Sequence, residues 1–199
     1  FGGEDRFWMG PEGGQYSIFF KAGDPFDFEH WQTPAFIDTE PFEILSAGRS
    51  EASFRRRVEV SNYSGTTFEL EITRTIRIVS PKDAGGLLEA ENLDTLDFIA
   101  FESENRVKNV GTEAWSREQG LLSIWILGMY LPSPKTTIIV PCNRVPGESG
   151  PVVNDEYFGK VPAERLKVGD KAIFFSGDGE YRSKIGLDPA HAAKVLGSW

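Results

Sequence analysis

The sequence has few of the residues on which many hydrolases and secreted proteins depend. It contains one cysteine, Cys142, so no disulfide can form within the chain. A lone cysteine of this kind is more often a small buried hydrophobe than a nucleophile. The two histidines are the only candidates for the base of a Ser–His–Asp triad, and no nucleophile-elbow motif accompanies them. The sequence therefore gives no support for a triad hydrolase.

Long apolar runs and excess basic charge are also lacking. The longest apolar run, residues 121–131, is shorter than the roughly 18 apolar residues of a membrane-spanning helix, so we expect no membrane insertion. The chain carries 21 Lys and Arg against 30 Asp and Glu, a net charge of −9. That balance disfavours nucleic acid as a partner and leaves a small neutral ligand open. The oligomeric state and the compartment are not indicated, although a periplasmic or extracellular location is favoured over a cytoplasmic one.

The sequence begins without methionine and without a signal segment, inside the glycine-rich stretch FGGEDRFWMGPEGG. We therefore expect a fragment of a longer protein, with an exposed strand edge or apolar patch where neighbouring strands are absent. Glycine adopts backbone angles closed to other residues, so this stretch is expected to form a tightly specified, irregular loop.

What the sequence does contain is mostly strand pattern. Residues 52–63 and 67–79 alternate apolar and polar side chains with a period of two, which is typical of half-buried antiparallel strands. Gly65, between them, predicts a hairpin turn with positive φ. With a further strand near residues 41–48, these segments predict a β-meander with one wet, charged face. The side chains expected to point inward from the second strand are Phe68, Leu70, Ile72, Ile76 and Ile78.

The rest of the chain continues the β pattern. Residues 96–111 predict another strand, and the apolar run at 121–131 predicts a strand buried on both faces. A Gly-Asp-Gly turn at 177–179 predicts a hairpin. Ser80-Pro81 predicts the start of one short helix. The predicted fold class is all-β: an antiparallel β-sandwich with little helix, spanning residues 1–199 as a single domain that forms part of a larger one.

Metal and cofactor motifs are weak. The stretch GPEGG matches neither the dinucleotide fingerprint nor the P-loop. Asp24, Asp27, Glu29 and His30 lie close together in DPFDFEH but lack the ordered spacing of a calcium loop. We expect no metal and no cofactor, and we interpret this segment as a solvated loop.

A sugar site is the more coherent interpretation. Aromatic residues make up 13% of the chain. Carbohydrate sites place aromatic faces against pyranose rings and surround them with Asp, Glu, Asn and Arg, often on loops. The candidate ligand-binding residues are Arg6, Trp8, Trp31, Asn105, Tyr157 and Arg182. The structural alternative stays open: Arg6 would then pair with a buried acid, and Trp8 would fill the core.

Several segments together resemble an uncharacterised bacterial family related to the galactose mutarotases, which are aldose 1-epimerases. They are GGEDRFWMGPEGGQYSIFF, HWQTPAFIDTEPFEI, FESEN, GLLSIWILGMYLPSP, VNDEYFGKVPAERL and GDGEYRSKIGL. The resemblance spans nearly the whole chain and is looser to the enzymes of known activity. It implies an antiparallel β-supersandwich with a sugar-sized cleft on one sheet.

The resemblance also implies a division of catalytic roles. In the epimerases a histidine protonates the ring oxygen and a glutamate deprotonates the anomeric hydroxyl, which requires pKa values tuned toward neutrality. The epimerases' histidine motifs are not recognisable here. His30 is the candidate acid, because it lies in a loop-like segment, whereas His191 is expected at the surface. Glu12 and Glu102 are the candidate carboxylates, with Glu40 and Glu104 as alternatives.

Three functions follow from these patterns. The first is a sugar-binding protein that resembles the epimerases, with mutarotation as its expected activity if it is an enzyme. The second is a non-catalytic carbohydrate-binding or polysaccharide-processing accessory domain. The third is a structural β-protein whose aromatic residues are core. For the first two, we expect Arg6, Trp8 and Glu12 to reach a concave surface shared with His30 and Trp31.

Overall fold

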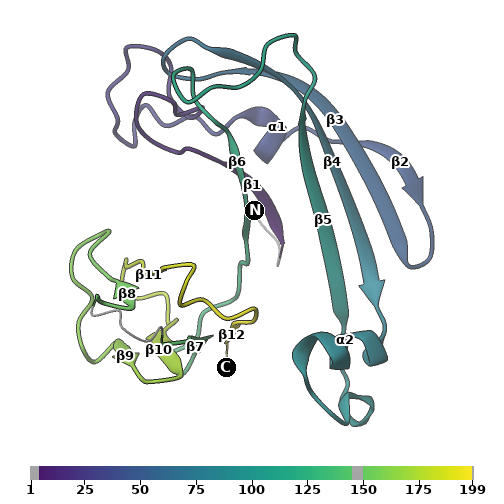
Figure 1. Cartoon of the computed structure of the whole chain (residues 1–199), viewed down its shortest axis with the longest axis vertical. Helices are drawn as coiled ribbons and strands as arrows, with labels where there is room; N and C mark the ends of the chain where they lie inside the picture. Colours follow the sequence, from purple (N-terminus) through teal and green to yellow (C-terminus); the bar gives the residue numbers. More distant parts are fainter. Residues whose placement is uncertain (1–4, 145–149, 199) are drawn as a thin grey trace. The chain divides into compact units, whose positions relative to one another are not determined.

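The computed structural model describes residues 5–144 and 150–198 and shows an all-β protein built from antiparallel strands (Figure 1). Gly2 and Gly3, the first glycine pair of the opening stretch, lie outside the described residues. The chain divides into two compact units, an N-terminal unit of residues 1–129 and a C-terminal unit of residues 130–199. The expectation of a single domain stays a prediction.

The N-terminal unit contains a four-stranded antiparallel sheet in the order β2-β3-β4-β5, the predicted meander. Its strands are β2 (Glu43–Ala47), β3 (Glu51–Ser61), β4 (Thr67–Val79) and β5 (Ala100–Asn109). The β3–β4 turn has Gly65 at φ 86°, as predicted. β2 is a sheet edge and all its residues are exposed, among them Ile44 and Leu45, so an exposed edge with apolar side chains is present.

A second layer of this unit is the two-stranded ribbon of β1 (Arg6–Gly10) and β6 (Ser123–Leu127). Its strand β1 packs on the inward face of the sheet, because Phe7, Trp8 and Met9 share one buried cluster with Phe68, Leu70 and Ile72 of β4. The prediction that the 121–131 run is buried on both faces is wrong. Ile124 and Ile126 are exposed, since among the described strands β6 pairs with β1 alone and joins no wider sheet.

The inward face of β4 is apolar only over part of its length. Phe68, Leu70 and Ile72 are buried, whereas Ile76 is half-buried and Ile78 is 58% exposed. The predicted parity is therefore confirmed, but the core ends after Ile72. Arg74 stands on the same face at that point and interrupts the apolar series.

Helical structure is short, as predicted. α1 (Ala35–Asp38) precedes β2, and α2 (Pro81–Leu88) is followed by the 3-10 turn η1 (Leu93–Thr95). The Ser80 hydroxyl accepts a hydrogen bond from the Asp83 amide, and Pro81 occupies the first turn, so α2 starts at the predicted signal. No helix in the described part of the chain is long and apolar enough to cross a membrane.

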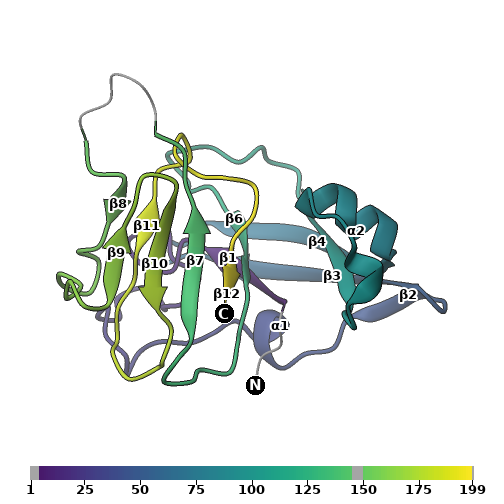
Figure 2. The same ribbon diagram turned by 90° about the horizontal axis from the view of Figure 1, so that it is seen from below.

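The C-terminal unit holds a second antiparallel sheet, with strand order β12-β7-β10-β9 (Figure 2). These strands are β7 (Thr137–Pro141), β9 (Leu166–Val168), β10 (Ala172–Ser176) and β12 (Gly197–Ser198), and a separate pair joins β8 (Val153–Asn154) to β11 (Gly186–Leu187). The hairpin predicted at 177–179 is wrong, because β11 pairs with β8 rather than with β10.

Two side chains of this unit bear on the sequence predictions. Cys142 is buried with Val152, Val153 and Ile173, as expected for a small hydrophobe. His191 is also buried, and its Nδ1 lies 2.9 Å from the Asn143 carbonyl oxygen. The expectation that His191 lies at the surface is wrong, because the turn that carries it packs against the chain next to Cys142, where Cys142 and Ala192 form an isolated bridge.

Candidate functional site

A cavity of about 410 Å³ opens in the N-terminal unit where the apolar face of β4 gives way to Arg74. It is bounded by β1, by the segment around α1, and by β3 and β4. Its walls combine four phenylalanine rings with two arginines and three carboxylates. The lining residues are Asp5, Arg6, Phe7, Phe36, Ile37, Asp38, Glu40, Phe42, Phe54, Arg74 and Ile76.

Arg74 is the central polar group of this cavity. Its guanidinium Nη2 lies 3.3 Å from Asp5 Oδ1, and its Cζ lies 5.7 Å from the centroid of the Phe7 ring. Burial lowers the pKa of Arg74 below its ordinary range, although the charge of Asp5 acts against that shift. Within the described structure its Nε is buried and has no hydrogen-bond partner. Arg74 is therefore a desolvated cation whose hydrogen-bonding capacity is only partly used.

Two further arginines are tied to carboxylates of the cavity wall. Arg6 forms an ion pair with Asp38 of α1, and its Cζ lies 4.8 Å from the centroid of the Trp8 ring. Arg56, which points inward from β3, forms an ion pair with Glu40. These pairs attach the α1 segment to β1 and β3, so they hold the cavity walls in place.

The opening stretch of the sequence builds the wall behind Arg6. The Trp8 ring is 7% exposed and stacks on Phe19 at a centroid distance of 5.4 Å. Its Nε1 donates to Glu12 Oε1 at 2.9 Å. Trp8 and Glu12 therefore bind each other, and Trp8 supports the guanidinium of Arg6 from beneath. Neither residue lines the cavity.

Trp31 and His30 lie in the loop between β1 and α1. Trp31 packs on Phe19 at 4.6 Å and donates from Nε1 to Thr33 Oγ1 at 2.9 Å. The Nδ1 of His30 lies 2.6 Å from Asp27 Oδ1, and this hydrogen bond raises the pKa of His30. Trp8 and Trp31 therefore share Phe19 as a neighbour, while His30 has its own carboxylate partner in a more exposed position. A surface shared by these residues and a ligand stays a prediction.

The two candidates on β5 point to opposite faces of the sheet. Asn105 lies directly across from Arg74 on the inward face, where its Nδ2 donates to Ser103 Oγ at 3.0 Å. Among the described side chains, its Oδ1 is a buried acceptor without a hydrogen bond. The Asn105 side chain thus places, beside Arg74, a second polar group with unused hydrogen-bonding capacity.

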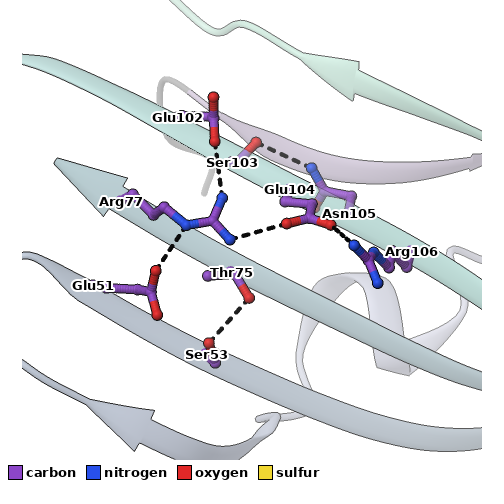
Figure 3. A network of polar contacts seen from close by, with 9 residues as sticks. All are labelled: Glu51, Ser53, Thr75, Arg77, Glu102, Ser103, Glu104, Asn105 and Arg106. Atoms are coloured by element: carbon purple, nitrogen blue, oxygen red, sulfur yellow. Dashed lines mark hydrogen bonds and ion pairs between the residues drawn. The ribbon is translucent and has the colours of Figure 1, made fainter. Parts of the chain in front are cut away.

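Glu102 lies on the outer face, within a network centred on Arg77 of β4 (Figure 3). Arg77 donates to Glu51 at 2.7 Å, to Glu102 at 2.8 Å and to Glu104 at 3.0 Å. The three carboxylates raise the pKa of Arg77, and Arg77 with Arg106 lowers the pKa of Glu104. Glu102 and Glu104 therefore share one arginine in the structure.

The profile of a family of unknown function, DUF6786, matches residues 1–199. The chain belongs to this family. No curated protein and no solved structure matches it. The family assignment carries no activity, so the function of this DUF6786 chain must be argued from its side chains.

Tyr157 and Arg182 lie in the C-terminal unit of this DUF6786 chain and belong to one cluster. The Tyr157 and Phe158 rings meet edge to face at a centroid distance of 4.7 Å, and the Arg182 Cζ lies 4.4 Å from the Phe158 centroid. The β8–β11 pairing explains this contact, because Asn154 pairs with Gly186 and the loops next to them emerge side by side.

Most of the residues that line the cavity were not predicted from the sequence. Of the candidate residues, Arg6 and Glu40 line it, and Asn105 adjoins Arg74. Arg56 and Arg74 were detectable, since each is a charged residue at an inward position in an otherwise apolar alternation. Asp5 and Asp38 carry no such signal, because only the folded chain brings them to arginines that are distant in sequence. In the described part of the chain, no three His, Cys, Asp or Glu side chains converge as a metal site.

Proposed function

We propose that this DUF6786 chain binds a sugar in the cavity of its N-terminal unit. The observation that carries the proposal is the composition of the cavity wall: phenylalanine rings beside Arg74, a mostly buried guanidinium with unused hydrogen-bonding capacity. Its volume of about 410 Å³ falls in the range of roughly 300–1,000 Å³ typical of small-molecule sites. The resemblance to the mutarotase-related family supports a saccharide as the ligand class.

Each part of the wall has a role in this proposal. Phe42 and Phe54, the half-buried rings of the wall, offer apolar faces to the C–H groups of a pyranose. Arg74 and Arg6 offer planar, bidentate donors for hydroxyl or carboxylate oxygens. Asp5 and Asp38 hold these guanidinium groups in position and retain lone pairs that can accept from sugar hydroxyls.

Binding is favoured over epimerisation by the pairing of the acidic groups. Asp5, Asp38 and Glu40 each form an ion pair with an arginine, so the carboxylates of the cavity wall already serve to hold these cations in place. His30, with its raised pKa, suits a proton donor, but it is bonded to Asp27 and is not among the residues that line the cavity. The proposed function is therefore carbohydrate binding, with mutarotation as the second candidate because His30 supplies an acid.

Calorimetric titration with a panel of neutral and acidic monosaccharides tests the proposal. We expect Arg74→Gln to weaken binding of the best ligand by about tenfold or more, since a charge-assisted hydrogen bond is lost. Arg57→Gln is the matched control, because Arg57 points from β3 to the outer face and pairs with Glu71. Equal losses in the two variants, or no binding by any sugar, would contradict the proposal.

An anomer-exchange measurement by NMR separates the two candidates. If the protein binds the sugar without catalysing its epimerisation, His30→Ala should leave the rate of anomer exchange unchanged. If His30 acts as a general acid, the same variant slows exchange by roughly 10²–10⁴-fold with the fold intact.

A further inference from the structure

The C-terminal unit carries a row of alternating cations and aromatic rings, which we call the cation–aromatic ladder. It consists of Arg165, Tyr181, Arg182, Phe158, Tyr157 and Lys184. The Arg165 Cζ lies 5.4 Å from the Tyr181 centroid, Arg182 lies 4.4 Å from Phe158, and the Lys184 Nζ lies 4.1 Å from Tyr157. Tyr181 and Arg182 are neighbours in sequence, and the Tyr157 and Phe158 rings meet at a centroid distance of 4.7 Å, so the three pairs lie near one another.

The rings of the ladder remain accessible although a cation lies over each of them. Tyr157 is 61% exposed, Phe158 47% and Tyr181 44%. Large rings at such exposure offer apolar faces that a ligand can cover. The cations beside them place positive charge next to those faces.

A shallow hollow continues the ladder at Arg165. It has a volume of about 340 Å³, and its wall carries three cations, Lys135, Arg165 and Lys167, against one acid, Glu164. Hydroxyls of Thr136, Thr137 and Ser176 and the ring of Phe174 complete the wall. Arg165 forms an ion pair with Asp178, which fixes the guanidinium between the hollow and Tyr181.

Charge sets this unit apart from the rest of the chain. Residues 130–199 carry nine Lys and Arg against eight Asp and Glu, whereas the chain as a whole has 21 against 30. An anionic ligand therefore meets less repulsion here than on the average surface of the protein. Aromatic faces select the C–H faces of sugar rings, and cations select carboxylates.

We infer that the cation–aromatic ladder binds an acidic oligosaccharide, a chain of uronic acid units. The inference rests on the proposed function only in taking the ligand to be a saccharide, since the ladder and the cavity share no residue. Rings would stack on Tyr157 and Phe158, while Arg182 and Lys184 would contact carboxylates.

Single-stranded nucleic acid is the competing polyanion, because it also binds alternating aromatic and basic residues. Such binding uses a strongly positive groove that follows the phosphates. The near balance of nine bases and eight acids in residues 130–199 does not supply such a groove, whereas single cations beside rings suit separate carboxylates, so the saccharide is the better fit.

Titration of the whole chain with a hexamer of galacturonic acid, and with the same hexamer fully methyl-esterified, tests the inference. The esterified form keeps the ring faces and removes the charge. We expect the acid form to bind at least about tenfold more tightly, with an affinity that falls as salt is added. Equal binding of the two forms, failure of the acid form to bind, or tighter binding of an oligonucleotide of equal charge would overturn the inference.

Variants locate the interaction. The double variant Arg182→Gln with Lys184→Gln should lose about tenfold or more in affinity for the acid form. Lys171→Gln with Lys194→Gln is the control, since it removes the same charge from exposed residues of this unit outside the ladder. Equal losses in the two double variants would overturn the assignment to the ladder.

Arg74→Gln and the ladder variant, each measured with the acid hexamer and with the best-binding monosaccharide, separate the inference from the proposed cavity function. If Arg74→Gln loses monosaccharide binding and the ladder variant does not, the cavity is the monosaccharide site. If the ladder variant loses hexamer binding and Arg74→Gln does not, the ladder is the hexamer site. Each result stands whether or not the other is obtained.

Discussion

At the scale of single residues, the informative feature is charge on a face that should be apolar. Arg56 and Arg74 occupy inward positions of β3 and β4, where the alternation predicts hydrophobic side chains. The sequence reveals this departure, but it does not reveal the partners. Asp5 lies 69 residues from Arg74, and such a pairing depends on how β1 packs against the sheet. Inward charge could be predicted, and the cavity around it could not.

His30 gives a prediction about titration. Because Asp27 accepts a hydrogen bond from its ring, the pKa of His30 is raised, and NMR titration should find it above the ordinary value of about 6.5. Asp27→Asn should bring it back toward that value, whereas Asp24→Asn, which removes a weaker influence, should lower it less. The pair stabilises the fold fully below about pH 6.5, and this contribution disappears as the pH rises through the raised pKa. An unchanged His30 titration in Asp27→Asn would contradict the assignment.

Arg77 gives a prediction about acid stability. Arg77→Gln removes the cation that Glu51, Glu102 and Glu104 share and leaves these carboxylates close together. Arg57→Gln breaks a single ion pair, with Glu71. At pH 7 the free energy of unfolding of the Arg77→Gln variant should therefore be the lower of the two. The pKa of Glu104 is lowered, so the stabilisation is present above its ordinary pKa of about 4.5 and is lost as the pH falls through the lowered value. Denaturant titrations at pH 7 and pH 3 should show the difference shrinking at pH 3. A difference that persists would contradict the network's role.

At the scale of elements, the meander was predictable because its two long strands alternate with period two and join through a glycine turn. The strand at 121–131 was predicted with the wrong burial. A continuous apolar run indicates that a segment avoids water, but it does not indicate how many strands will pair with it. In the part of the chain that the structure describes, β6 pairs with β1 alone. The short strands of the C-terminal unit pair across loops, which local patterns do not encode.

The β3–β4 turn gives a prediction about glycine. Gly65 has φ 86°, and an added Cβ would meet no atom within 4 Å, so Gly65→Ala should destabilise only through its backbone, by about 1–2 kcal/mol. Gly86→Ala is the matched control, because Gly86 lies in α2 with equal space around it and alanine favours a helix by about 1 kcal/mol. The midpoint of chemical denaturation should therefore fall in Gly65→Ala and rise in Gly86→Ala. Equal shifts in one direction would argue against the turn.

The β4 strand gives a prediction about where the core ends. Leu70 is fully buried, so Leu70→Ala should lower the free energy of unfolding by about 2–5 kcal/mol. Ile78 has the same parity on the same strand but is 58% exposed, so Ile78→Ala should change it by about 0.5 kcal/mol. If denaturation shows that the two variants lose comparable free energy of unfolding, the inward face of β4 is covered along its whole length.

At the scale of the whole molecule, the chain combines two compact units with different chemistry. The N-terminal unit presents a cavity with aromatic walls and paired arginines, and the C-terminal unit presents exposed rings beside cations. Composition indicated an acidic protein and left a small neutral ligand open. The charges are unevenly distributed along the chain, because acids outnumber bases in residues 1–129, whereas the two are nearly equal in number in residues 130–199. That distribution supports a saccharide whose acidic groups meet the C-terminal unit.

A sugar bound in the cavity beside Arg74 should change the Nε–H signal of that side chain. Arg74 has a buried Nε without a hydrogen-bond partner in the described structure and lines the cavity, whereas the Nε of Arg57 donates to Glu71 on the outer face of the sheet. During titration with a binding monosaccharide, the NMR resonance of the Arg74 Nε–H should shift and saturate, while that of the Arg57 Nε–H should stay in place. A sugar that binds and leaves the Arg74 resonance unmoved would contradict the account.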